Sequence, residues 1–201
     1  MNSKLIKVSM EALVTIAISC GLLFLPLSYQ SMGIDVAILP LIIFALRRGV
    51  LPSVMTNLVF GLVVFLIQYP VAGSVGSNIV DTVIAYLMVT LAALFARNTV
   101  RTAFNVRLSS TRLNIVTASL FAVLASQVMH LFAMTMASPT VLNESLVSFS
   151  EGFQGIWLIM LLLWIGISLV LVILLQIKRE IFVPKNTRFL SRREKSHLLN
   201  D

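Results

Sequence analysis

Three apolar stretches of this sequence carry polar or ionisable side chains close to one predicted end of each stretch. Asp81 lies in one stretch, His130 in another, and Glu151 and Gln154 open a third. An ionisable group in hydrocarbon costs about 2.5–3.5 kcal/mol, so it normally faces the interior of a helix bundle or a cavity. A carboxylate, an imidazole and a carboxamide at one depth are suited to binding a small polar or cationic molecule.

Asp81 belongs to a polar stripe. The spacing i, i+3, i+4 places Asn78, Asp81 and Thr82 on one helix face, and Tyr86 follows one turn later. We interpret this stripe as one wall of a ligand pocket. In the alternative interpretation, Asp81 is interfacial and caps the start of its helix, where the helix dipole favours a negative charge.

His130 has Gln127 three residues earlier on the same predicted face. We expect its depth to match that of Asp81. The alternatives are a histidine satisfied by a backbone carbonyl or a neighbouring helix, and a proton relay. The relay is less well supported, because no chain of further acids or histidines accompanies His130.

The third stretch surrounds its acid and its amide with aromatic side chains, which are Phe149, Phe153 and Trp157. Aromatic residues at a membrane interface are common on their own. Glu151 and Gln154, three residues apart on one face, are more informative. The three stretches together predict an anionic pocket with aromatic walls, open to the outside, for an aromatic cation or an aminopyrimidine.

The composition identifies the class of protein. Of the 201 residues, 58% are hydrophobic and 11% are charged, whereas charged residues make up about a quarter of a soluble domain. The chain is therefore predicted to be a polytopic membrane protein. Its net charge of +7 favours anionic lipid headgroups over nucleic acid as the partner, because the basic residues flank apolar stretches.

Six membrane-spanning helices are predicted, with both termini in the cytoplasm of a bacterial cell. The second is short, contains Pro40 and has the alternative of a re-entrant segment. Six crossings put every Lys and Arg on the cytoplasmic side, as the positive-inside rule requires. The predicted spans are about Leu5–Leu27, Ile34–Leu46, Val50–Gln68, Asn78–Ala96, Leu113–Met136 and Phe153–Ile177.

The predicted connections differ in character. Gly49 ends a tight turn after two arginines, and Arg97–Arg112 is expected to be a polar cytoplasmic loop. Ala137–Glu151 is expected to be the longest outer loop. Residues 1–177 form the predicted substrate-binding bundle, and residues 178–201 form a basic, solvated or headgroup-bound tail.

Glu11 is predicted to pair with Lys7, four residues earlier on the same helix, and to have no functional role. The single Cys20 excludes an internal disulfide. A retained first helix, rather than a cleaved signal peptide, is expected because no Ala-x-Ala-like site follows it.

Enzymatic motifs are missing from the sequence. It has no phosphate-binding G-x-x-x-x-G-K-[ST] loop, no H-E-x-x-H, no Cys/His metal spacing and no G-x-S-x-G. We therefore expect neither catalysis nor a cofactor. Transport by this chain would need an ion gradient or a partner that hydrolyses ATP.

Several of these segments resemble one family. The run from Met32 to Pro40, the Arg47-Arg48-Gly49 turn and Gly61 are similar to the substrate-binding (S) components of energy-coupling factor vitamin transporters, and most similar to the thiamine-specific type. The resemblance continues at Asp81, at His130, and through Phe149-Ser150-x-x-Phe153-Gln154-Gly155. Thr82 and Ser138 depart from it, at positions where the family has a tyrosine and a tryptophan.

The resemblance implies a function and partners. Asp81 would recognise an aminopyrimidine, and His130 would belong to the same pocket. The partners would be a transmembrane coupling subunit and two ATPase subunits. Small residues on the first helix would dock on the coupling subunit; here they are Ala12, Ala17 and Gly21, with Ala17 and Gly21 four residues apart.

Two other functions are compatible with the residues. One is a small membrane scaffold or assembly protein without a ligand, in which the polar residues mediate helix packing. The other is a gradient-driven carrier, which is less favoured because the sequence shows no internal repeat and no ion-coordinating broken helix.

Overall fold

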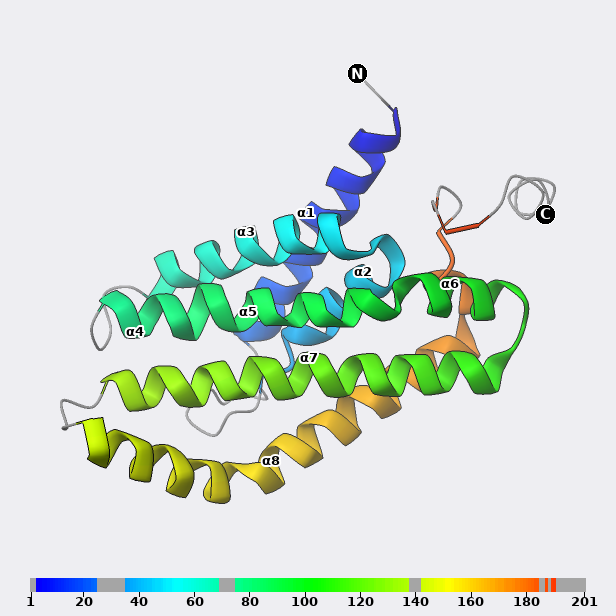
Figure 1. The fold of residues 1–201 in the computed structure, drawn as a ribbon. Coiled ribbons are helices and arrows are strands. Elements are labelled where there is room, and N and C mark those ends of the chain that lie inside the picture. The colour runs from blue at the N-terminus through cyan, green and yellow to red at the C-terminus, as the bar shows by residue number, and fades with distance from the viewer. Residues whose placement is uncertain are drawn as a thin grey trace.

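The structure is a computed structural model that describes residues 3–24, 35–68, 75–137, 142–184, 187 and 189–190. At residues 3–4, 68, 137 and 142–156 it describes the backbone alone. Every element in these ranges is helical (Figure 1), which confirms the predicted all-α class. The helices are α1 (Ser3–Leu23), α2 (Ile38–Arg48), α3 (Val50–Gln68), α4 (Val75–Ile79), the π-turn η2 (Val80–Ile84), α5 (Ala85–Met88), the 3-10 segment η3 (Val89–Phe95), α6 (Ala96–Phe104), α7 (Leu108–Ala137), α8 (Leu142–Ile177) and η4 (Arg179–Ile181).

Five segments within the described ranges are long and apolar enough to cross a membrane, so the chain is a multi-pass membrane protein. They are Leu5–Leu23, Val50–Ile67, Val75–Phe104, Leu108–Met136 and Trp157–Ile177. The second predicted span corresponds to α2, which has 11 residues. At 1.5 Å per residue it is about 16 Å long, roughly half of the hydrocarbon thickness. The sixth crossing therefore stays a prediction.

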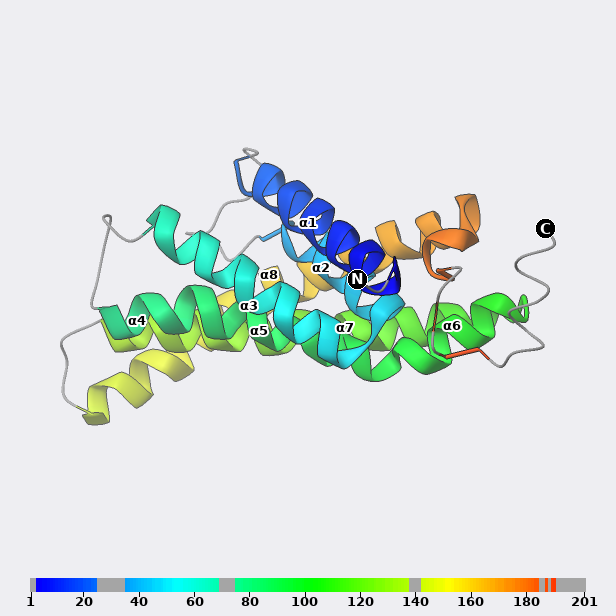
Figure 2. The same ribbon diagram turned by 90° about the horizontal axis from the view of Figure 1, so that it is seen from above.

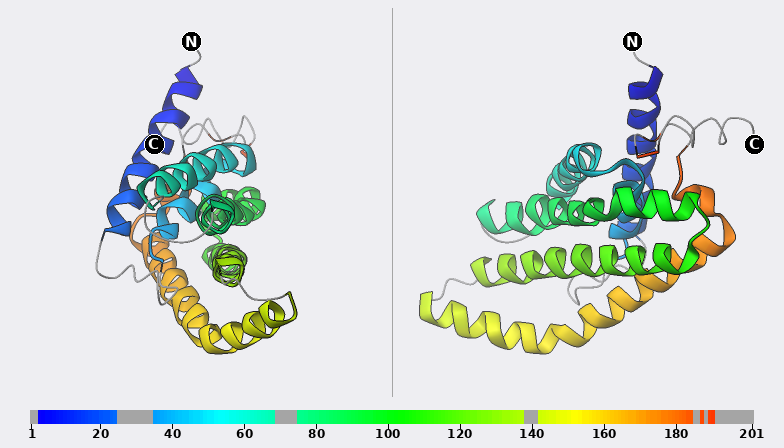
Figure 3. Two further views of the ribbon diagram at one scale, coloured as in Figure 1. Left: turned by 90° about the vertical axis from the view of Figure 1, so that its left-hand side faces the viewer. Right: turned by 45° about the vertical axis from the view of Figure 1, so that its right-hand side comes forward.

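The chain direction alternates between the long helices. In Figure 1, α3 and α7 run from right to left, and the rod from α4 to α6 and helix α8 run from left to right. Helix α7 packs against α8 and against this rod. Seen from above in Figure 2, α3 crosses the rod obliquely. Helix α1 is inclined to the others and projects from them (Figure 3), and only 6% of its apolar window is buried.

The basic clusters gather at one end of the bundle. Helix α2 ends at Arg48, α6 and α7 meet around Arg107, and α8 ends just before Lys178. These three places lie on the right in Figure 1. The predicted turn at Gly49 is observed, since Gly49 adopts a φ of 82° and its N–H donates to Ala45 O. We refer to this end as the basic end.

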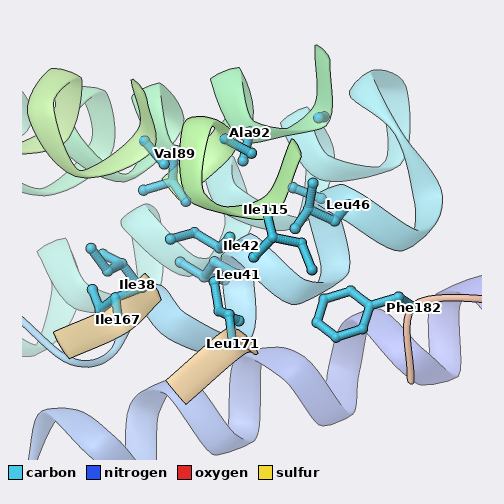
Figure 4. Packing of buried hydrophobic residues seen from close by; sticks show 14 of the residues in the cluster. Ile38, Leu41, Ile42, Leu46, Val89, Ala92, Ile115, Ile167, Leu171 and Phe182 are labelled. Atoms are coloured by element: carbon cyan, nitrogen blue, oxygen red, sulfur yellow. The ribbon is translucent and has the colours of Figure 1, made fainter. Parts of the chain in front are cut away.

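The short helix α2 forms the centre of the core. Ile38, Leu41 and Ile42 are fully buried, and Figure 4 shows them between residues of η3, α7 and α8. Neighbouring helices therefore separate most of α2 from the lipid, since eight of its 11 residues are buried. A helix that is buried in protein does not have to be as long as a helix that crosses the membrane in contact with lipid.

The predicted polar loop at Arg97–Arg112 is wrong. Helix α6 continues the rod through Phe104, and only residues 105–107 separate it from α7. Ala96, Thr99, Val100 and Ala103 are buried, and their spacing is that of one helix face. The charged residues of this segment indicated a loop, but they occupy the solvated face of an amphipathic helix.

Two further expectations differ from the structure. Helix α8 begins at Leu142, so most of the loop predicted at Ala137–Glu151 is helical. The start of the predicted tail is also packed against the bundle rather than solvated, because Phe182 is 0% exposed and belongs to the core. This phenylalanine gives the basic segment an apolar anchor.

Glu11 does not depend on Lys7. Its carboxylate accepts from Arg48 Nε at 2.7 Å, from Arg48 Nη2, and from Arg47 Nη2 at 3.3 Å. These ion pairs join the first half of α1 to the end of α2. The sequence interpretation chose the local partner, although two arginines distant in sequence lie closer in space.

Candidate functional site

The structure brings Asp81 and His130 together. His130 Nδ1 lies 2.8 Å from Asp81 Oδ1, which is a hydrogen bond between the η2 turn and helix α7. Asp81 comes six residues after Val75 and His130 seven residues before Ala137, so each lies about 10 Å inside its helix end. The equal depth that the sequence predicted is therefore observed. Asp81 is near the start of the rod from α4 to α6 and His130 near the end of α7, so both residues are in the half of the bundle away from the α6–α7 junction and the basic end.

A π-turn presents Asp81. The N–H of Ala85 donates to Val80 O, five residues earlier, as well as to Thr82 O. Such turns are rare and are frequently found at functional sites. The wider turn changes which side chains share a face. Asp81 and Tyr86, five residues apart, both reach His130, and the Tyr86 ring packs edge-on against the imidazole with ring centroids 5.8 Å apart.

Asp35 is a member of the site that the sequence analysis did not identify. It precedes α2, is 3% exposed, and accepts a hydrogen bond from the Ala37 N–H at 2.9 Å through Oδ1. Tyr86, His130 and Asp81 are all close enough to its carboxylate for electrostatic interaction. An acid placed directly before a fully apolar segment was the signal that could have identified it.

Two side-chain nitrogen atoms of this cluster are available for further hydrogen bonds. His130 Nε2 and Gln127 Nε2 are buried, and neither has a hydrogen-bond partner among the side chains and backbone that the structure describes. With Asp81 ionised, a neutral His130 carries its proton on Nδ1, which leaves Nε2 as an acceptor. Buried polar groups normally have partners, so these atoms are suited to a polar ligand.

Helix α3 supports the cluster from behind. The rings of Phe60 and Tyr86 meet edge to face with centroids 4.7 Å apart. One residue further, Gly61 lies directly against the π-turn: a Cβ there would be 2.8 Å from Val83 Cα and 3.0 Å from Thr82 O. Glycine is required at this position because the two backbones are in contact.

The other predicted pocket residues are distributed differently. Asn78 is half-buried and its carbonyl accepts from the Thr82 hydroxyl at 2.7 Å. Thr82 is 1% exposed. Its backbone faces α3, so the stripe expected from α-helical spacing is divided between two neighbours. The side chains of Phe149, Glu151, Phe153 and Gln154 lie outside the described residues.

Trp157 is not placed with the Asp81–His130 pair. It is 50% exposed and lines an apolar cavity of about 220 Å³ between α7 and α8, together with Trp164, Leu120 and Leu124. Leu124 precedes His130 by six residues, about 9 Å along α7. The sequence analysis grouped Trp157 with Phe149 and Phe153 as an aromatic wall of the pocket, whereas its ring lies at the level of Leu120 and Leu124 on α7.

The small residues of α1 do not form one stripe. Ala17 and Gly21 are exposed, and nothing lies within 4 Å of a Cβ built on Gly21. Ala12 is half-buried on another face. The exposed face carries Leu13 and Val14, which are 64% and 57% exposed. Ala17 and Gly21, without Ala12, therefore remain as the predicted docking residues.

The arrangement has a definite chemical character. Two carboxylates, from Asp35 and Asp81, stand near one imidazole, so the cluster has more acid than base. Two aromatic rings, of Tyr86 and Phe60, border it. Such a site attracts a cation and can pair with a donor such as an exocyclic amino group.

Comparisons with known proteins place the chain. The model of a family described as thiamine transporter protein (Thia_YuaJ) matches residues 9–182. No match was found among curated proteins. A solved structure described as native-SAD phasing for ThiT from Listeria monocytogenes serovar has the same fold, with a TM-score of 0.71 and 18% sequence identity. The match covers 91% of this chain and 100% of that one.

Proposed function

This chain belongs to the thiamine transporter protein family, and on that premise we propose that it captures thiamine, or a closely similar molecule, from outside the cell membrane. The hydrogen-bonded Asp81–His130 pair carries the proposal. It joins two helices at a single point, and it leaves the buried His130 Nε2 without a described partner and so able to bind a ligand.

Thiamine offers groups that match this site. Its aminopyrimidine ring has an exocyclic amino group that would donate to His130 Nε2 or to the free oxygen of Asp81. Its permanently charged thiazolium ring would be balanced by the carboxylates of Asp81 and Asp35. Tyr86 and Phe60 support the imidazole from the side, and Gln154 and the aromatic residues Phe149 and Phe153 are proposed to complete the walls.

We propose that uptake itself is driven by partners. The chain would act as an S component that delivers thiamine to a transmembrane coupling subunit, and two ATPase subunits would supply the energy. The exposed face of α1 around Ala17 and Gly21 is the proposed docking surface. Both termini and the basic end would face the cytoplasm, in agreement with the positive-inside rule.

Calorimetric titration of the purified chain with thiamine tests the binding step. Calorimetry is preferable to tryptophan fluorescence, because both tryptophans lie along the α7–α8 cavity rather than at the pair. We expect saturable binding with one site, lost or strongly weakened in Asp81→Asn and retained in Glu180→Gln, which removes an exposed carboxylate near the basic end. Absence of binding at millimolar thiamine would contradict the proposal.

Affinity purification of the tagged chain from native membranes tests the coupling step. The proposal predicts two copurifying ATPase subunits and a membrane subunit, and fewer of them after Ala17→Leu, which places a bulky side chain on the exposed face of α1. A scaffold without a ligand predicts neither thiamine binding nor ATPase subunits.

A further inference from the structure

A second charged site lies at the basic end, between the first half of α1 and the end of α2. It borders a cavity of about 290 Å³ that is lined by Met10, Val14, Ile43, Phe44, Thr15, Glu11 and Arg47. Four of these seven side chains are apolar, and the two charged ones, Glu11 and Arg47, form an ion pair where α2 ends. The cavity therefore has an apolar wall and a charged mouth.

The charges at this mouth do not balance. Arg48 takes both oxygens of Glu11 with its planar fork, through Nε and Nη2, which is the strongest geometry for an arginine–carboxylate pair. Arg47 has a single, longer contact to the same carboxylate, at 3.3 Å. One carboxylate thus faces two guanidinium groups, and Arg48, only 8% exposed, is the one that it neutralises.

Arg47 retains unused donors. Its side chain is 23% exposed, and its Nε is buried without a hydrogen-bond partner in the part of the chain that the structure describes. An arginine has five N–H donors in a planar fork that suits phosphate. Lys7, one turn before Glu11 on α1, adds another exposed positive charge at the same end.

The apolar wall faces the surrounding membrane. Met10 and Val14 are 60% and 57% exposed, and both lie within the candidate span Leu5–Leu23. A soluble anion would use the charged mouth and leave this wall uncovered. An amphiphile with a negative head and an apolar chain would use both.

We infer that this cavity is a binding site for one anionic phospholipid, with its phosphate on Arg47 and an acyl chain along Met10, Val14 and Ile43. Basic pockets between membrane helices on the cytoplasmic side are suited to anionic headgroups. The bound lipid would neutralise the excess charge and fill the angle between α1 and α2.

The test is a lipid titration of the delipidated full chain in neutral detergent, followed by native mass spectrometry. The probes are phosphatidylglycerol and phosphatidylcholine with the same acyl chains. We expect phosphatidylglycerol to bind about fivefold more tightly, equivalent to about 1 kcal/mol for one basic residue. Arg47→Gln should abolish this preference, and the matched control Arg97→Gln, an exposed arginine at the same end, should retain it.

Two further experiments test the inference without the Arg47→Gln variant, in case that variant folds poorly. Val14→Trp changes an exposed position and should block the acyl wall, which lowers phosphatidylglycerol binding while Arg47 is intact. Glycerol phosphate, which has the charge without the chains, should not compete. Equal binding of the two lipids, equal effects of Arg47→Gln and Arg97→Gln, full binding to Val14→Trp, or competition by glycerol phosphate would each overturn the inference.

Discussion

Two charged clusters stand in different halves of this bundle, and they use their carboxylates in opposite ways. At Asp81 a single hydrogen bond to His130 leaves buried nitrogen atoms without a described partner. At Glu11 both carboxylate oxygens are occupied by arginines. The first cluster keeps bonding capacity for a ligand, whereas the second uses its carboxylate to hold α1 against α2.

The backbone conformation also differs between the two clusters: it is irregular at Asp81 and regular at Glu11. Asp81 stands on a π-turn that α3 touches through Gly61. Glu11 and Arg48 stand on regular α-helices, and the change of direction is left to Gly49. Irregular backbone near membrane depth is tolerated where protein buries it, and here it coincides with the cluster that has unused polar atoms.

Asp81→Asn should give the largest change in ligand affinity. Removing a charged hydrogen-bonding partner costs about 1.5–3 kcal/mol, so we expect thiamine affinity to fall about 100-fold with little change in Tm. Calorimetry of the variant beside Glu180→Gln measures this. An unchanged affinity would mean that the pair serves packing rather than binding.

Glu11→Ala should lower the stability of the fold and leave the affinity for thiamine unchanged. It leaves the nearly buried Arg48 without a counter-charge, which costs 3–5 kcal/mol for a fully buried pair. Because the Glu11 side chain is 34% exposed, we expect about 2 kcal/mol, or a fall in Tm of about 4–8 °C, with thiamine affinity retained. Lys7→Ala is the control, and an equal effect from it would restore the pairing that the sequence suggested.

Gly61→Ala tests the contact between α3 and the π-turn. The added methyl group would push against Val83 and displace Asp81, so we expect thiamine affinity to fall about tenfold, or 1.4 kcal/mol. Gly166→Ala is the matched control, since nothing lies within 4 Å of its Cβ position. Similar behaviour of the two variants would show that the close approach does not position the site.

Of the four single variants, Asp35→Asn should cause the smallest change in free energy. The amide oxygen can still accept from the Ala37 N–H, and only the charge is lost. We expect about fivefold weaker binding of thiamine and no change for an uncharged aminopyrimidine fragment, both measured by calorimetry. An equal loss for the two ligands would assign Asp35 to the structure of the loop instead of to the cation.

The sequence predicted the helical class, the third span and the similar depth of Asp81 and His130, because each depends on hydropathy and depth along a helix. The resemblance to thiamine-specific S components is confirmed by the family match over residues 9–182. Membership in this family of transporters also confirms the expectation that the chain is not an enzyme.

The errors share a physical cause. Arg48 and Phe182 each find their partners in segments remote in sequence, which no local pattern reports. Glu11 was assigned to Lys7, the nearest cation along the same helix. The π-turn also shifted the face on which Thr82 lies, because a fixed α-helical period does not hold through it.

The central claim is that Asp81 and His130 act together on one ligand, and a double-mutant cycle on thiamine binding tests it most directly. Asp81→Asn, His130→Ala and the double variant would be titrated by calorimetry under the same conditions. Residues that act as a unit show interaction energies of about 0.5–3 kcal/mol. We predict that the double variant binds no more than about threefold more weakly than the worse single variant; fully additive losses would contradict the account.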